Sequence, residues 1–199
     1  MKRILITYFL MTVLFAGIAH SGPRKDLPLD PRTSVINVQV PLEGNNIQSF
    51  FWNTGVFNQD LRTTDTPGFY WPKGTGHAAI FTTGLSICAY YQGSLRASMG
   101  SYKGEYSPGY INDQGALVTN SKFKIYTVKS GDNEFTNPDY ANWPLMIPYG
   151  APYVDIDSNG TYTQGVDIPG IKNAAQTIFV CLTDGDPGQH TSSEGFGGG

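Results

Sequence analysis

Histidine and cysteine are scarce in this chain, which has three His and two Cys among 199 residues. A catalytic zinc site usually takes three protein ligands, often His, and neither H-E-x-x-H nor C-x-x-C occurs. The serine-hydrolase pattern G-x-S-x-G is also missing, because Cys88 stands where GLSIC would need its second Gly. These absences argue against zinc-dependent and serine-hydrolase chemistry, and we expect the chain not to be an enzyme.

Long hydrophobic runs are absent as well. The longest apolar run, residues 4–18, falls short of the roughly 20 residues that a transmembrane helix needs. It follows Lys2 and Arg3 and precedes the small residues around Ser21, which are the three zones of a secretory signal peptide. We therefore predict a signal peptide over residues 1–21, cleavage before Gly22, a secreted or cell-surface location, and no transmembrane segment in the mature chain.

Positive charge is also in short supply. The formal net charge is −3, and removal of the two cations of the signal peptide makes it −5. This sign argues against nucleic acids and anionic lipids as partners. An extracellular polysaccharide or another surface protein is the kind of partner that the predicted location leaves.

Glycine, proline and aromatic residues are plentiful, with 24 Gly, 13 Pro and 13% aromatics. This mixture favours short strands and turns over long helices. We predict a mainly-β fold of antiparallel, sandwich-like sheets with long irregular loops and little helix. Residues 22–44 are expected to form a linker with one edge strand at 34–40. Residues 45–199 are expected to form a β-rich domain that is truncated at its C-terminus, because the chain stops without a closing element.

Several segments are predicted as strands. Residues 78–91 and 94–102 flank Gln92-Gly93, a step typical of a tight hairpin turn. Residues 122–129 and 176–183 are the other strand predictions, and residues 137–143 the one short helical turn. Cys88 and Cys181 lie in apolar runs. They form either one disulfide, as an exported protein allows, or two buried free thiols.

One segment has metal-ligand spacing. Residues 155–160 read D-x-D-x-N-G, the opening half of an EF-hand-type calcium loop. Alternate residues of a tight loop direct Asp155, Asp157 and Asn159 inward, and Thr161 adds its backbone carbonyl. Position 12 of the loop is a valine, and the carboxylate arrives one residue later as Asp167, so Gly165 must bend the backbone. We favour a structural Ca²⁺ site over the alternative, an Asx-rich turn that binds nothing.

Tryptophan supports a second hypothesis. The mature chain has Trp52, Trp71 and Trp143, which stack on sugar rings in a carbohydrate-binding or glycan-processing module. The alternative is that these side chains fill the core and anchor loops.

A family resemblance rests on five segments: NTGVFNQD, GFYWPKGTG, GEYSPGY, MIPYGAPYVDIDSNGTY and QTIFVCLTDGDP. Together they resemble the N-terminal region of large secreted bacterial proteins that end in a type IX secretion sorting domain. The resemblance covers most of the chain from Asn45 onward. It implies export and surface attachment, but no activity and no active-site residues. The terminal sorting domain is absent from this sequence.

Overall fold

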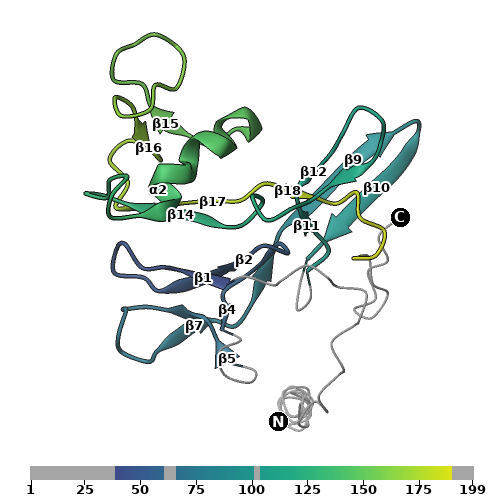
Figure 1. The fold of residues 1–199 in the computed structure, drawn as a ribbon. Helices are drawn as coiled ribbons and strands as arrows, with labels where there is room; N and C mark the ends of the chain where they lie inside the picture. Colours follow the sequence, from purple (N-terminus) through teal and green to yellow (C-terminus); the bar gives the residue numbers. More distant parts are fainter. Residues whose placement is uncertain (1–38, 61–65, 101–103, 190–199) are drawn as a thin grey trace, which may run out of the picture. The chain divides into compact units, whose positions relative to one another are not determined.

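The computed structural model in Figure 1 describes residues 39–60, 66–100 and 104–189. The chain divides into two units, Met1–Pro31 and Arg32–Gly199, and every described residue belongs to the second. The predicted signal peptide, its cleavage site and the first part of the predicted edge strand lie outside the described residues. No helix in the described part of the chain has the length and apolarity to cross a bilayer.

The mainly-β prediction is confirmed, and every strand pair within the described residues is antiparallel. The largest sheet has the order β1-β2-β3-β8. Its strands are β1 (Gln39–Leu42), β2 (Ser49–Trp52), β3 (Val56–Phe57) and β8 (Thr83–Gly84). β1 lies at the edge of this sheet and pairs with β2 alone among the described strands, so an edge strand does occur at the end of the predicted linker.

The remaining described strands form two-stranded ribbons. They are β4 (Gln59–Asp60) with β5 (Thr66–Pro67), β6 (Phe69–Tyr70) with β7 (Ala78–Ile80), β9 (Ser86–Tyr91) with β10 (Ser94–Met99), β11 (Ser107–Pro108) with β18 (Leu182–Thr183), β12 (Tyr110–Ile111) with β13 (Leu117–Val118), β14 (Tyr126–Lys129) with β17 (Gln176–Phe179), and β15 (Tyr153–Val154) with β16 (Ile168–Pro169). The sheets are therefore shorter and more numerous than the sequence suggested.

The β9–β10 hairpin is the strand pair that the sequence predicted. Its turn residues Gln92 and Gly93 have φ values of +50° and +78°, which suit a tight hairpin turn. Residues 78–91 do not form one strand, however. They form β7, β8 and β9, which pair with three different partners, β6, β3 and β10. A run of strand-forming residues does not indicate where pairing changes from one partner strand to the next.

The other two strand predictions were also too long. β14 begins at Tyr126, because residues before it form a turn in which the Phe123 N–H donates to the Asn120 carbonyl. Residues 176–183 divide into β17 and β18, since the partner changes from β14 to β11.

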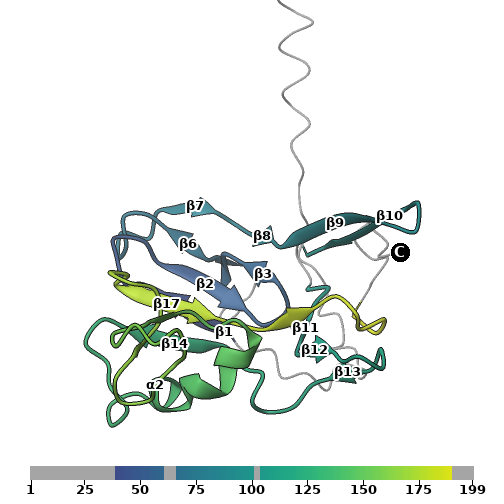
Figure 2. The same ribbon diagram turned by 90° about the horizontal axis from the view of Figure 1, so that it is seen from above.

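The main hydrophobic core among the described residues is formed by the β14–β17 ribbon and two short helices, α2 (Pro138–Asn142) and the 3₁₀ helix η1 (Trp143–Tyr149). Figure 2 shows α2 beside β14. Its buried members are Phe123, Tyr126, Val128, Trp143, Met146 and Ala151. Trp143 is fully buried, and its Nε1 donates to the Pro152 carbonyl at 2.9 Å. The predicted helical turn at 137–143 is confirmed. Asn137 caps α2 by accepting from the Asp139 N–H at 2.8 Å.

Both cysteines are free thiols, so the disulfide alternative is wrong. Cys181 is half-buried and donates to the Gly109 carbonyl at 3.3 Å. Burial raises the pKa of the Cys181 thiol. Cys88 is exposed on β9, which contradicts the expectation of a buried thiol, because the β9–β10 ribbon exposes its apolar side chains, with Tyr90 at 80% and Leu95 at 60%.

Candidate functional site

The β15–β16 hairpin carries the loop that the sequence singled out (Figure 1). Its stem consists of two cross-strand pairs, Tyr153 with Pro169 and Val154 with Ile168. Asp155 directly follows the first strand and Asp167 directly precedes the second. An antiparallel stem sets such flanking residues opposite each other, which explains how two residues so far apart in sequence meet.

Three carboxylates converge in this loop. Asp155, Asp157 and Asp167 each offer one oxygen, and these three oxygens lie within 4.8 Å of one another. Asp155 is half-buried, Asp157 is exposed and Asp167 is buried. The cluster therefore opens to solvent on the Asp157 side and is closed on the Asp167 side.

Asp167 fastens the loop to its stem. Its side chain is only 2% exposed, and both oxygens accept backbone hydrogen bonds, Oδ1 from Ile156 and Oδ2 from Thr163, each at 2.7 Å. The backbone bends before it: Gly165 has a φ of +81°, and the N–H groups of residues 166 and 167 both donate to the Thr163 carbonyl. This is the bend that an acid one residue beyond position 12 requires.

Asp155 accepts from the opposite side of the loop. Its Oδ2 accepts from the Gly160 N–H at 2.8 Å and its Oδ1 from the Asn159 N–H at 3.2 Å. The Gly160 hydrogen bond is the largest cause that holds the pKa of the Asp155 carboxyl below its usual value. Backbone donors of this kind favour the charged form, which is the form that binds metals.

Asn159 connects the two halves of the loop. Its Nδ2 donates to Asp157 Oδ2 at 2.8 Å and to Thr163 Oγ1 at 2.9 Å. Its Oδ1 accepts from both the N–H and the hydroxyl of Thr161 at 2.7 Å. Thr163 lies outside the D-x-D-x-N-G pattern and was not among the predicted ligands. It occupies position 9 counted from Asp155, an EF-hand ligand position, so the same count would have found it.

Tyr162 packs the loop against its stem. Its ring meets the Tyr153 ring edge to face, with centroids 5.3 Å apart. The pKa of Tyr162 is raised to about 12. Burial is the largest cause, and the nearby Tyr140 hydroxyl and Asp167 carboxyl groups add to it. The loop is therefore held by an aromatic contact as well as by hydrogen bonds.

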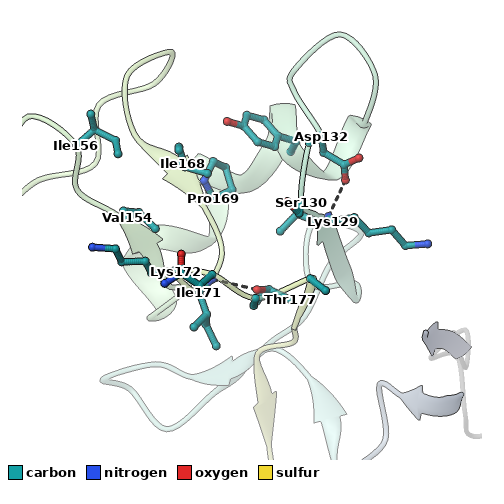
Figure 3. A pocket seen from close by; sticks show the side chains of 16 residues that line it. Lys129, Ser130, Asp132, Val154, Ile156, Ile168, Pro169, Ile171, Lys172 and Thr177 are labelled. Carbon is teal, nitrogen blue, oxygen red and sulfur yellow. Dashed lines mark hydrogen bonds between the residues drawn. The ribbon is translucent and has the colours of Figure 1, made fainter. Parts of the chain in front are cut away.

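A cavity of about 720 Å³ lies beside the loop stem. Val154, Ile156 and Ile168 line one side of it, and Ser130 and Asp132 line another (Figure 3). Asp132 is its one lining carboxylate, and Oδ2 of this residue accepts from the Lys129 N–H at 2.8 Å and from Asn137 Nδ2 at 2.6 Å. The cavity therefore offers an apolar wall and no cluster of acids.

The three tryptophans occupy different environments. Trp143 is fully buried and Trp52 is 7% exposed, with its Nε1 donating to the Gln59 carbonyl at 3.0 Å. These two side chains fill the interior, as the alternative to sugar stacking expected. Trp71 is 59% exposed and lies in the turn between β6 and β7, so it alone of the three presents a large open surface.

Comparison with known proteins gives no relative: no family model, no curated protein and no solved structure matches the chain. The resemblance to secreted proteins with a type IX sorting domain therefore stays a prediction. The local geometry of the 155–167 loop is the basis for the function proposed next.

Proposed function

We propose that this chain is a non-catalytic portion of a secreted or cell-surface protein and that its 155–167 loop binds a structural Ca²⁺ ion. One observation carries the calcium proposal: three carboxylates from a D-x-D-x-N-G segment and its closing acid converge within 4.8 Å. Hard cations take several oxygen ligands at such spacing.

Electrostatics favours a cation among these groups. Two like charges 4.8 Å apart repel by about 1 kcal/mol in bulk water and by about 3.5 kcal/mol at an effective dielectric constant of about 20. Three carboxylates make three such pairs, and the buried position of Asp167 limits screening on its side. A divalent cation at the centre replaces this repulsion with attraction.

Asn159 supplies the adjustment that binding requires. Its Nδ2 now donates to Asp157 and Thr163, so the amide hydrogens interact with oxygens that would otherwise face a cation. Rotation of the amide by half a turn exchanges Nδ2 for Oδ1 and makes Asn159 a ligand. The carbonyl of Thr161 and the hydroxyl of Thr163 complete a set of neutral oxygens around Asp155, Asp157 and Asp167.

The donor set fits calcium better than magnesium. Magnesium demands near-ideal octahedral geometry, whereas calcium accepts six to eight oxygens in flexible arrangements. A short loop with one exposed acid, Asp157, is adaptable in this sense. We expect a dissociation constant on the order of 10⁻⁴ to 10⁻³ M, the range of extracellular modules.

Calorimetric titration and thermal melts test the proposal. Calcium should bind the parent and raise its melting temperature, and magnesium should do less. Asp157→Ala should abolish the shift, and Asp113→Ala, which removes an exposed acid elsewhere, should keep it. A parent that binds no calcium at millimolar concentration, or an Asp157→Ala variant that retains the shift, would show that the loop is a turn only.

Export is the other half of the proposal, and the charged, apolar and small-residue zones of residues 1–21 support it. N-terminal sequencing of exported protein should begin at Gly22, and a mature form that keeps Met1 would contradict it.

The alternative function, carbohydrate binding, is supported by the exposed Trp71. Retention on polysaccharides that Trp71→Ala removes would favour this alternative.

A further inference from the structure

Asn159-Gly160 is the one Asn-Gly step in the sequence. Such steps deamidate without an enzyme, because glycine has no side chain to shield its backbone nitrogen. The Gly160 nitrogen loses its proton and attacks Cγ of Asn159, ammonia leaves, and a succinimide forms. Water then opens the ring to give aspartate or isoaspartate. In sum, one asparagine and one water become one acid and one ammonia.

The folded loop withholds both reacting groups. The Gly160 N–H donates to the Asp155 carboxylate at 2.8 Å, and an anionic acceptor opposes loss of that proton. The Asn159 side chain is held by its own bonds to Asp157, Thr161 and Thr163, so it is not free to swing toward the Gly160 nitrogen. The reaction therefore requires the loop to open first.

We propose that Asn159 is a conformation-gated deamidation site, protected while the loop is closed and modified when the loop opens. The modification adds a negative charge beside Asp155, Asp157 and Asp167. The isoaspartate product also adds one backbone carbon to the loop, which displaces the hydrogen bonds that follow it. The modification therefore prevents the loop from closing in its original form. Protection rests on hydrogen bonds and does not depend on the proposed calcium site.

Mass spectrometry of the peptide that contains Asn159 tests this proposal on the full chain, incubated with a chelator at mildly alkaline pH. The parent should deamidate more slowly than the same chain unfolded in denaturant. Asp155→Asn keeps the side-chain shape but removes the charged acceptor, and it should accelerate the reaction about tenfold, which corresponds to about 1.4 kcal/mol. Asp113→Asn is the matched control and should leave the rate unchanged.

A second variant keeps the proposal testable if Asp155→Asn does not fold. Thr163→Val removes an acceptor of Asn159 Nδ2 without a change of shape and should also accelerate the reaction, by less than Asp155→Asn. A parent that reacts as fast as its unfolded chain, or variants that match Asp113→Asn, would overturn the proposal. Added calcium is a separate measurement. Slower deamidation would support the proposed calcium site, and an unchanged rate would count against that site but not against the deamidation proposal.

Discussion

The Asp167 carboxylate should be the strongest single support of the loop when no metal is bound. Asp167→Ala removes the acceptor of two backbone N–H groups, those of Ile156 and Thr163. The Asp167 side chain is 2% exposed and the two hydrogen bonds are part-buried, so water replaces the lost acceptor only in part. The matched variant is Asp157→Ala, which removes an equal charge from the exposed side of the same cluster.

Two opposing effects set the magnitude. Each of these part-buried donors destabilises by about 1 kcal/mol when it is left without its acceptor, so the two together lose about 2 kcal/mol. Loss of one carboxylate also relieves its repulsion with the two that remain, by about 1 kcal/mol per pair in bulk water and by more at a lower effective dielectric constant. Because this relief occurs in both variants, the two hydrogen bonds set the difference between them, and Asp167→Ala should be less stable than Asp157→Ala by about 2 kcal/mol. Asp157→Ala should change stability by less than about 1 kcal/mol.

Amide hydrogen exchange is the appropriate assay, since a loop opens locally while the rest of a domain stays folded. With a chelator present, protection across residues 155–167 should fall in Asp167→Ala and persist in Asp157→Ala. Denaturant unfolding measures any loss that reaches the whole domain. Equal losses of protection in the two variants would refute the reasoning, because burial of Asp167 would then have no energetic consequence.

Three further predictions follow from the same contacts. Burial raises the pKa of Tyr162 from 10.0 to about 12, so the folded chain holds this proton more tightly than the unfolded chain. The contribution of Tyr162 to the free energy of unfolding should be full below pH 10 and lost as the pH rises toward 12. In alkaline thermal melts, Tyr162→Phe should lack this pH-dependent contribution. Gly55→Ala should destabilise by about 2 to 4 kcal/mol, since its Cβ would lie 2.4 Å from a Tyr106 ring carbon; Gly74→Ala, with a similar positive φ and open space, should lose about 1 kcal/mol in denaturant titrations. Asn159→Asp should melt lower in chelator and bind calcium more tightly in calorimetry.

The features that the sequence predicted are those that local chemistry determines. The β9–β10 turn follows from Gln92-Gly93, which adopts positive φ at both residues. The start of α2 follows from Asn137, whose side chain caps the first turn. Strand lengths failed because pairing is non-local: β17 and β18 are separated by a change of partner from β14 to β11, and no residue between them records that change.

The candidate site likewise combines a local feature that the sequence predicted with a non-local feature that it did not. The spacing of Asp155, Asp157 and Asn159 is a local pattern, and it located a loop in which three carboxylates converge, while the metal itself stays a prediction. Burial of Asp167 depends on the β15–β16 stem, which is made of only two pairs, and it was not predicted. Thr163 was missed although it stands at position 9 counted from Asp155, and the hydrogen bonds that it makes to Asn159 and Asp167 show its contribution.

The identity of residue 159 matters because an amide both donates and accepts. In the loop without metal, its Nδ2 donates to oxygens of Asp157 and Thr163, whereas an aspartate at this position would repel the Asp157 carboxylate. In the calcium-bound loop that we propose, the same side chain would turn its oxygen inward and add no further charge to the acidic cluster. Asparagine would therefore allow the loop to close in both states, whereas aspartate would close it only around a cation. If both proposals hold, asparagine is useful at this position although it is prone to deamidation, and its protection by Asp155 preserves a loop that can close with and without a cation.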